Sequence, residues 1–415
     1  MKVGNMMSYV IIVGGQLHNK GAQAMTFTVV DKIKDKYPDK EVVLFSSLYT
    51  ERDRLEKNEL NFQIFPWSIV LKMKILGLVE SLHVGIKEYI KYFIIGTGLS
   101  KNKFNKIKYI LKNADLMIDV SGYALSSQRG FKASLSYLYN IKIAKKYRIP
   151  TVLFPQSFGP FNYKKKESKI IIPLIKEYLE YPEIIYAREE DGVKHLNPFN
   201  LNNVIHSYDS VLLGKKEFTL SHLFRPHAID SQRLDFEIYD NSVAIVPNEK
   251  IMEHGNEKLQ YELYKILINE LLRNNKNIYL LRHSFEDLEI CKNIKSEFMN
   301  NNRVILIKED LNCIQIDLLL RQFEFLIASR YHAIIHAYKN RVPTLVFGWA
   351  IKYQELLKYF LQEKYLFDVR NNQNKDSILR SLDLMLDNYK EESDVITKRM
   401  NQLETVQLLD EISIN

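Results

Sequence analysis

The chain has 415 residues, 46% of them hydrophobic and 26% charged, which is typical of a soluble globular protein with two domains rather than one. Its net charge of +8 would suit an anionic substrate, a membrane surface or nucleic acid equally. The two cysteines, Cys291 and Cys313, exclude a disulfide framework and a four-cysteine zinc site, and they favour a reducing compartment.

The first half of the chain alternates short apolar runs with longer helical segments. Each run is apolar throughout, which is typical of a parallel strand buried on both faces. Strands of this kind are predicted at residues 8–13, 41–46, 115–120, 151–154 and 184–187. Helices are predicted at residues 22–36, 134–146 and 167–181. This alternation predicts a doubly wound α/β domain, which we place at residues 1–216.

The same pattern starts again after a polar, irregular join near residues 217–241. Strands are predicted at residues 242–247, 277–281, 304–307, 325–328 and 344–347, and helices at residues 256–274, 312–321 and 331–339. This second α/β domain, residues 217–374, is followed by a helical tail at residues 375–415. Two Rossmann-like domains that face each other form a cleft, and ligands bind at the carboxyl ends of their strands.

One segment departs from this pattern. Residues 67–112 carry nine lysines and only two acidic residues, so the segment has a net charge of +7. Apolar and aromatic residues lie between the lysines, which would suit the surface of an anionic membrane. An amphipathic helical insertion with a solvated lysine face explains the pattern equally well. Nucleic acid is disfavoured, because no motif of a known nucleic-acid-binding fold accompanies the charge.

Three loops that follow predicted strands carry candidate cleft residues. Glycines in such loops let a ligand approach the backbone, and hydroxyl or amide side chains there can contact a substrate. The candidates are Gly14, Gly15, Asn19, Gln23, Ser121, Gly122, Gln156 and Ser157. The first loop matches neither the dinucleotide-binding nor the P-loop glycine pattern. Each loop could equally be a tight turn or a helix cap, so both interpretations stay open.

Cationic residues follow two other predicted strands. Arg188 could grip a carboxylate or phosphate, or it could pair with one of its acidic neighbours. Arg330 and His332 follow a later strand, where Ser329 can cap the next helix. Arg330 supplies fixed charge, and His332 can exchange a proton near neutral pH. Lys352 lies just beyond the last predicted strand and could add a further cation.

Five motifs occur in a fixed order along the chain. They are N-K-G-A-Q-A (19–24), D-V-S-G (119–122), P-Q-S-F-G-P-F (155–161), A-R-E-E-D-G (187–192) and S-R-Y-H-A-I-I-H-A (329–337). Their order and spacing resemble those of the polysaccharide pyruvyl transferases. The resemblance implies two domains arranged as in GT-B glycosyltransferases. It also implies transfer of the enolpyruvyl unit of phosphoenolpyruvate to a sugar diol, which makes a pyruvate ketal.

The resemblance also implies a donor site. Arg188 and the pair Arg330 and His332 match the phosphoenolpyruvate site of the family, and we add Ser329 and Lys352 to it. In this hypothesis the two arginines hold the two anionic groups of the donor, and His332 protonates its methylene carbon.

Two departures from the common family pattern concern the acceptor. The first loop lacks the acidic G-D-E of many members, and Tyr208-Asp209-Ser210 stands where Pro-Asp is frequent. We therefore expect an acceptor that differs from those of better-known members.

We thus expect an enzyme of polysaccharide or exopolysaccharide biosynthesis that uses phosphoenolpyruvate as co-substrate and needs no cofactor or metal. Its acceptor would be a sugar of a polysaccharide or of its lipid-linked precursor. Its location would be the cytoplasm, with peripheral attachment of residues 67–112 to the inner face of the plasma membrane. Two alternatives stay open: a GT-B glycosyltransferase that uses a nucleotide sugar, and a non-catalytic, membrane-associated scaffold for polysaccharide assembly.

Overall fold

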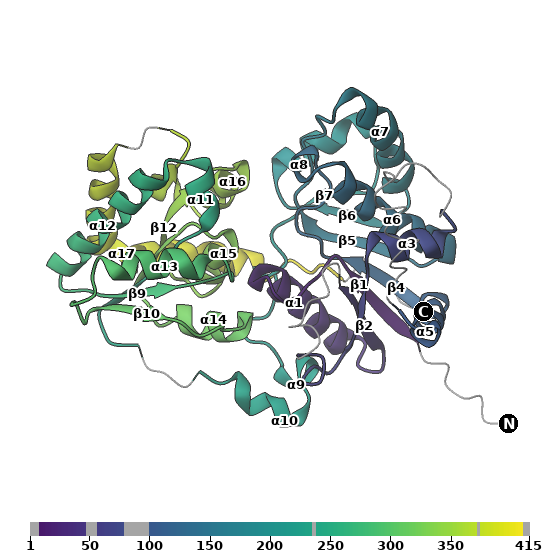
Figure 1. Ribbon diagram of the computed structural model, residues 1–415, viewed down its shortest axis with the longest axis horizontal. Helices are drawn as coiled ribbons and strands as arrows, with labels where there is room; N and C mark the ends of the chain where they lie inside the picture. The colour runs from purple at the N-terminus through teal and green to yellow at the C-terminus, as the bar shows by residue number, and fades with distance from the viewer. Residues whose placement is uncertain (1–7, 47–55, 79–98, 235–237, 372–373, 410–415) are drawn as a thin grey trace.

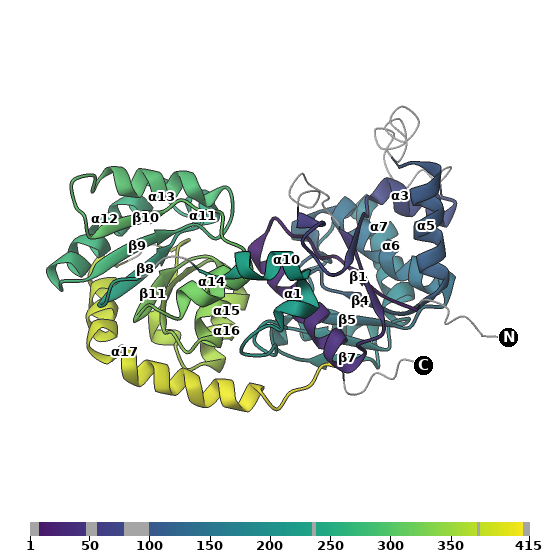
Figure 2. The ribbon, with the colours of Figure 1, turned by 90° about the horizontal axis from the view of Figure 1, so that it is seen from below.

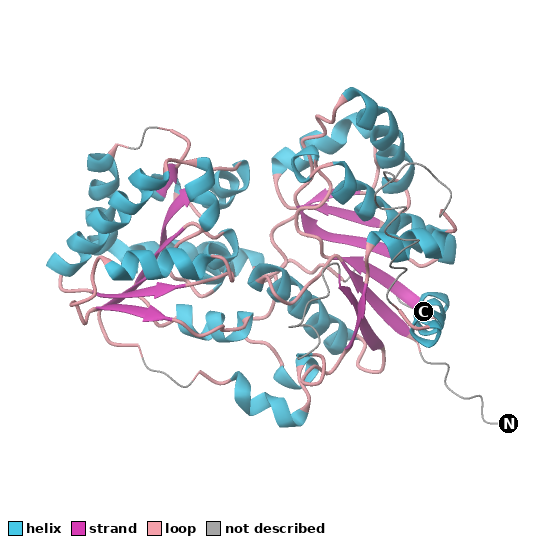
Figure 3. Ribbon diagram, in the orientation of Figure 1, coloured by secondary structure: helices cyan, strands magenta, loops and turns pink. Residues whose placement is uncertain are grey.

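The computed structural model describes the chain except for residues 1–7, 47–55, 79–98, 235–237, 372–373 and 410–415 (Figure 1). It contains two α/β lobes, each built on one parallel sheet (Figure 3). The predicted α/β fold class with two doubly wound sheets is therefore confirmed.

The N-terminal lobe is built on a seven-stranded sheet with the order β3-β2-β1-β4-β5-β6-β7, the order of a doubly wound fold. Its strands are β1 (Tyr9–Val13), β2 (Glu41–Ser46), β3 (Gln63–Pro66), β4 (Ala114–Asp119), β5 (Thr151–Gln156), β6 (Ile184–Ala187) and β7 (Val204–His206). Its helices are α1 (Lys20–Lys36), α3 (Ile69–Leu76), α5 (Lys101–Lys112), α6 (Phe131–Tyr147), α7 (Lys165–Leu179) and α8 (Glu190–Leu196). The short helices α9 (Leu220–Leu223) and α10 (Pro226–Ile229) then lead to the second lobe.

The C-terminal lobe has a six-stranded parallel sheet with the order β10-β9-β8-β11-β12-β13. Its strands are β8 (Ser242–Val246), β9 (Asn277–Leu281), β10 (Val304–Ile307), β11 (Phe325–Ala328), β12 (Thr344–Gly348) and β13 (Leu366–Asp368). Its helices are α11 (Glu249–His254), α12 (Glu257–Arg273), α13 (Asp287–Ser296), α14 (Cys313–Leu320), α15 (Tyr331–Lys339), α16 (Ile351–Tyr359) and α17 (Lys375–Leu403).

Three strands were not predicted from the sequence, and all three are sheet edges: β3, β7 and β13. Their side chains are largely half-buried or exposed, because an edge strand has a neighbour on one side only. Their sequences therefore lack the continuous apolar run that marks the inner strands.

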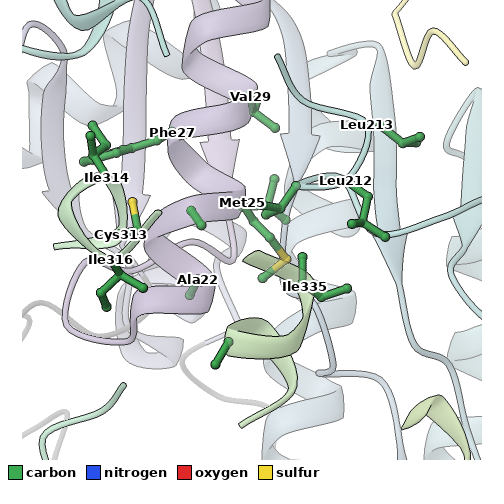
Figure 4. Close-up of a cluster of buried hydrophobic side chains, with 14 of the residues drawn as sticks. Ala22, Met25, Phe27, Val29, Leu212, Leu213, Cys313, Ile314, Ile316 and Ile335 are labelled. Atoms are coloured by element: carbon green, nitrogen blue, oxygen red, sulfur yellow. The ribbon is translucent and has the colours of Figure 1, made fainter. Parts of the chain in front are cut away.

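The two lobes share an apolar core at part of their junction. Helix α1 of the N-terminal lobe packs against α14 and α15 of the C-terminal lobe. Figure 4 shows Phe27 of α1 beside Ile314 of α14 and Met25 of α1 beside Ile335 of α15, and all four are buried. The contact around α1 is therefore closed, and space for a ligand remains elsewhere along the junction.

The end of the chain returns to the N-terminal lobe. Helix α17 lies along the C-terminal lobe, and the segment after it crosses to the other lobe (Figure 2). There Leu408 and Leu409 are buried, and the Tyr186 hydroxyl donates a hydrogen bond to the Leu408 carbonyl at 3.2 Å.

The basic segment at residues 67–112 is described only in part, because residues 79–98 lie outside the described residues. Lys72 in α3 is buried, and its Nζ donates to the Ser136 carbonyl at 2.9 Å, so this lysine belongs to the core. Helix α5 instead exposes its five lysines and contains no acidic residue. Among the described residues, no helix combines the length and apolar character needed to cross a membrane.

Candidate functional site

A pocket of about 200 Å3 lies at the junction of the lobes. The N-terminal lobe contributes residues at or after the carboxyl ends of β6 and β7: Arg188, Glu189, Glu190, His206, Tyr208, Asp209 and Leu212. The C-terminal lobe contributes Tyr331, Lys352, Glu355, Leu356, Lys358, Tyr359 and Arg399. A larger hollow of about 580 Å3 between α12 and α13 contains none of the predicted site residues.

Arg188 is held by a dense set of contacts at the end of β6. Its Nη1 donates to Asp209 Oδ2 at 2.8 Å, its Nε to Glu189 Oε1 at 2.8 Å, and its Nη2 to Ser157 Oγ at 2.6 Å. Burial opposes the charged form, but these carboxylates outweigh it and raise the pKa of Arg188. Arg188 is therefore permanently charged, and its side-chain hydrogen bonds are made to other residues of the protein.

Asp209 connects this arginine to His332 on the opposite lobe. Asp209 Oδ2 lies 3.5 Å from His332 Nε2, and its Oδ1 accepts the Val211 N–H at 2.9 Å. Burial alone would raise the pKa of Asp209, but His332, Arg188 and the Val211 N–H bring it well below its usual range. One carboxylate therefore lies within ion-pair distance of both predicted site residues, Arg188 and His332.

His332 sits at the start of α15, against the first turn of α1. A Cβ on Gly21 would lie 2.2 Å from His332 Nδ1, so only glycine allows this close approach. Burial lowers the pKa of His332, and Asp209 opposes the shift without cancelling it. The imidazole is therefore neutral near pH 7 in the absence of a bound anion.

Tyr331 separates two cations at the pocket wall. The Arg188 guanidinium carbon lies 4.8 Å from the centre of its ring, and Lys352 Nζ lies 4.9 Å from it. Burial, followed by repulsion from Arg188, lowers the pKa of Lys352 to about 8. Among the described residues, no carboxylate lies within ion-pair distance of Lys352. Of the predicted donor-site cations, it is the one without a carboxylate partner.

Arg330, Ser329 and His332 do not line the pocket, although Asp209, next to His332, does. Arg330 Nε donates to Asp287 Oδ2 at 2.7 Å, and its Nη2 donates to Glu286 Oε1 at 2.9 Å, so both acids of the α13 start hold this guanidinium. Ser329 does not cap α15 as predicted, because Arg330 occupies the N-cap position without a side-chain bond. The Ser329 side chain is buried, and its carbonyl accepts the Tyr353 hydroxyl at 3.0 Å.

The first predicted loop serves the junction of the lobes instead of the pocket. Asn19 caps α1 by accepting the Ala22 N–H at 3.1 Å, and Gln23 Oε1 accepts the Cys313 N–H of α14 at 2.9 Å. A Cβ on Gly15 would lie 2.4 Å from Thr26 Oγ1, which explains the glycine by close packing.

The other predicted loops are packed together. Gly14 has φ of +79° and lies against Ser121, where a Cβ would be 2.2 Å from the hydroxyl oxygen. The Gly122 carbonyl accepts the Ser157 N–H at 2.8 Å, and Gln156 is fully buried. Of the eight candidate cleft residues, only Ser157 contacts a residue of the pocket wall through its side chain, at Arg188 and Glu189.

The residues missed or assigned no role from the sequence include Gly21, Asp209, Tyr331 and Glu355. Glu355 in α16 accepts the N–H groups of Glu190 and Asp191 at 2.6 and 2.9 Å, so it caps a helix of the opposite lobe. For Asp209 the signal was its position at the carboxyl end of β7, an edge strand that the sequence did not reveal.

Two further histidines belong to structural pairs. His336 is fully buried and its Nδ1 lies 2.9 Å from Asp317 Oδ1. His222 pairs with Asp31 at 2.7 Å, and the neighbouring Asp35 pairs with Lys215 at 2.5 Å. Ligand atoms of Asp31, Asp35 and His222 lie within 4.8 Å of one another, but these internal pairs account for the group.

Comparisons with known proteins agree with this arrangement. The family model described as polysaccharide pyruvyl transferase matches residues 19–350. No curated protein matches the chain.

Solved structures of other proteins share the fold. A putative UDP-N-acetylglucosamine 2-epimerase from Listeria monocytogenes aligns with a TM-score of 0.55 at 12% identity, covering 95% of this chain and 91% of the other. The UDP-GlcNAc 2-epimerase of Methanocaldococcus jannaschii gives 0.55 at 13%, covering 94% and 99%. UGT71G1 of Medicago truncatula, complexed with UDP-glucose, gives 0.54 at 11%, covering 99% and 96%. These similarities confirm a GT-B-like fold.

Proposed function

The chain belongs to the polysaccharide pyruvyl transferase family, and from this premise we propose that it transfers the pyruvyl group of phosphoenolpyruvate to two hydroxyls of a sugar. The product is a pyruvate ketal, and inorganic phosphate is released. One observation carries the proposal: Asp209 joins Arg188 and His332 across the lobes, beside a pocket that contains Lys352.

In this proposal Lys352 binds the phosphate of the donor directly. Arg188 and Arg330 are each paired with two carboxylates, so we assign the direct contact with the donor phosphate to Lys352 instead. Arg188 instead holds Asp209 in place, and Asp209 orients His332. An arriving dianion would also raise the pKa of His332, because a nearby negative charge favours imidazolium.

The reaction then balances in two steps. Protonated His332 gives its proton to the methylene carbon of phosphoenolpyruvate, and a sugar hydroxyl attacks C2 while its own proton returns to the imidazole. A second hydroxyl then forms the second C2–O bond as the bond from C2 to the phosphate oxygen breaks. Its proton leaves with inorganic phosphate. A positioned proton donor contributes roughly a hundred- to ten-thousand-fold in rate.

The test is incubation of the protein with phosphoenolpyruvate and a panel of glycosides, with phosphate release and product mass as readouts. We expect phosphate release that depends on a glycoside, and a product with the added mass of a pyruvate ketal. His332→Ala should abolish turnover, and the exposed His227→Ala should not. No phosphate release with any glycoside, or normal turnover by His332→Ala, would contradict the proposal.

A glycosyltransferase is the second candidate, because UGT71G1, one of the solved structures that share this fold, is complexed with UDP-glucose. Thermal-shift titration separates the two, since a bound ligand raises the melting temperature. Stabilisation by phosphoenolpyruvate but not by UDP-sugars supports the pyruvyl transferase, and the reverse supports the alternative.

We also propose that α5 attaches the enzyme to the inner face of the plasma membrane. Its five exposed lysines stand without a single acidic residue in the helix. Each lysine near an anionic surface contributes about 1 kcal/mol, so Lys101→Gln with Lys103→Gln should weaken liposome binding about 30-fold. The same change at Lys390 and Lys398, exposed on α17, is the control. Binding that ignores anionic lipid and salt would contradict attachment.

A further inference from the structure

We propose that the pocket end formed by Tyr208, Tyr359, Lys358 and Arg399 binds the acceptor, and that this acceptor is a sugar bearing a phosphate group. The inference rests on the proposed function for its reaction, but binding at this place can be measured without turnover. None of these four residues was selected from the sequence as a site residue.

An aromatic pair from the two lobes forms the apolar part of this pocket end. Tyr208 follows β7, Tyr359 ends α16, and their ring centres lie 4.4 Å apart with the planes tilted by 49°. His206 extends the surface, with its ring centre 5.4 Å from that of Tyr208. Both tyrosines are only half-buried, so ring surface remains available. A sugar ring presents C–H groups on one face and hydroxyls at its edge, which suits an aromatic surface with polar tips.

Two cations border this surface without acidic partners. Arg399 of α17 lies with its guanidinium carbon 5.6 Å from the Tyr359 ring centre, and its Nη1 donates only to the neutral Gln402, at 3.2 Å. Lys358 is exposed at the pocket wall. Within the described part of the chain, neither has a carboxylate within ion-pair distance. Two such positive groups at one place favour an anionic ligand.

The acidic residues of the pocket are, with one exception, already occupied. Glu189 and Asp209 are paired with Arg188, and Glu355 accepts two backbone N–H groups of α8. Only the Glu190 carboxylate has no partner within the described residues. Lys358 and Arg399 are therefore the two cations at the Tyr359 end that form no ion pair with these carboxylates.

The position also fits the transfer reaction. Lys352, which we assign to the donor phosphate, lines the same pocket as Tyr359. The pocket has a volume of only about 200 Å3, so a donor and an acceptor that bind in it together would lie in contact. The phosphate of the acceptor would then lie at Arg399 and Lys358, away from the donor phosphate.

The experiment measures binding by isothermal titration calorimetry, with glucose, galactose, mannose and N-acetylglucosamine 1-phosphates as probes. The methyl glycoside of each sugar is the uncharged comparison ligand, and UDP-N-acetylglucosamine is the comparison ligand with a diphosphate. We expect at least one sugar phosphate to bind tenfold or more tightly than its methyl glycoside, because charge-assisted hydrogen bonds are the strong ones. Tighter binding of the UDP-sugar than of the corresponding monophosphate would overturn the inference in favour of a nucleotide-sugar site.

Variants locate the binding. Arg399→Ala and Lys358→Ala should each weaken the sugar phosphate at least tenfold and leave the binding of phosphoenolpyruvate unchanged. Arg380→Ala, an exposed arginine on the same helix, should change neither. Melting temperatures check that each variant is folded.

Three further outcomes would overturn the inference. They are equal binding of every sugar phosphate and its methyl glycoside, unchanged sugar-phosphate affinity in Arg399→Ala, and loss of phosphoenolpyruvate affinity in that variant. Failure of the proposed function would look different: sugar-phosphate binding would still depend on Arg399, but phosphoenolpyruvate would neither bind nor release phosphate.

Discussion

Replacing Asp209 with asparagine tests the connection between the lobes most directly. The change keeps the shape of the side chain and removes its charge from between Arg188 and His332. Breaking a buried ion pair costs about 3–5 kcal/mol. Arg188 keeps Glu189 as a partner, so we expect the free energy of unfolding to decrease by about 3 kcal/mol, the lower end of this range.

The effect on activity should be larger and should have its own pH signature. Asp209 raises the pKa of His332 against burial, so Asp209→Asn lowers that pKa further. A proton donor with a lower pKa is protonated only at lower pH. We therefore expect kcat to fall about a hundredfold or more near pH 7. The alkaline limb of the pH–activity profile should also shift to lower pH.

Asp317→Asn is the matched control, because it breaks another buried pair of histidine and aspartate. It should destabilise the fold similarly, judged by chemical denaturation, and leave kcat and its pH profile unchanged. A role of Asp209 in the reaction would be refuted if folded Asp209→Asn kept kcat within threefold of the original protein. Equal loss of activity in both variants would refute it as well.

Three other predictions follow from single contacts. Lys352 is charged below its pKa of about 8 and loses its charge as the pH rises through that value, so kcat/KM for phosphoenolpyruvate should fall above pH 8. Lys352→Arg should remove this fall, and identical profiles would count against the assignment. Gly21→Ala should stabilise the helix by about 1 kcal/mol, but the added Cβ should displace His332. We therefore expect a folded variant with at least a tenfold lower kcat/KM, and full activity would refute the contact. Glu355→Ala should speed hydrogen exchange at the first-turn amides of α8, whereas exposed Glu363→Ala should not.

The inner strands of both sheets could be predicted from the sequence because each is apolar on both faces. For example, the predicted strands at 41–46 and 277–281 have the bounds of β2 and β9. The edge strand β10 was also predicted, because its sequence is an unbroken apolar run. The other three edge strands escaped prediction because their sequences lack such a run, and Asp209 follows one of them.

The site could be predicted only residue by residue. Arg188 and Lys352 were identified as cations, and both line the pocket. The sequence could not show that Arg330 would form an ion pair with Asp287, which lies 43 residues earlier and follows another strand. Nor could it show that α1 would pack on the second lobe, which turns Gln23 from a candidate ligand contact into a structural one.

The return of the chain to its starting lobe restricts how the two halves can move. The polypeptide passes between them once after β7 and again after α17, where Leu408 and Leu409 are anchored beside Tyr186. Together with the packing of α1 on α14 and α15, these two crossings restrain the motion of one half against the other. Removing the last ten residues would therefore release one of these restraints and expose apolar surface on the half where synthesis began.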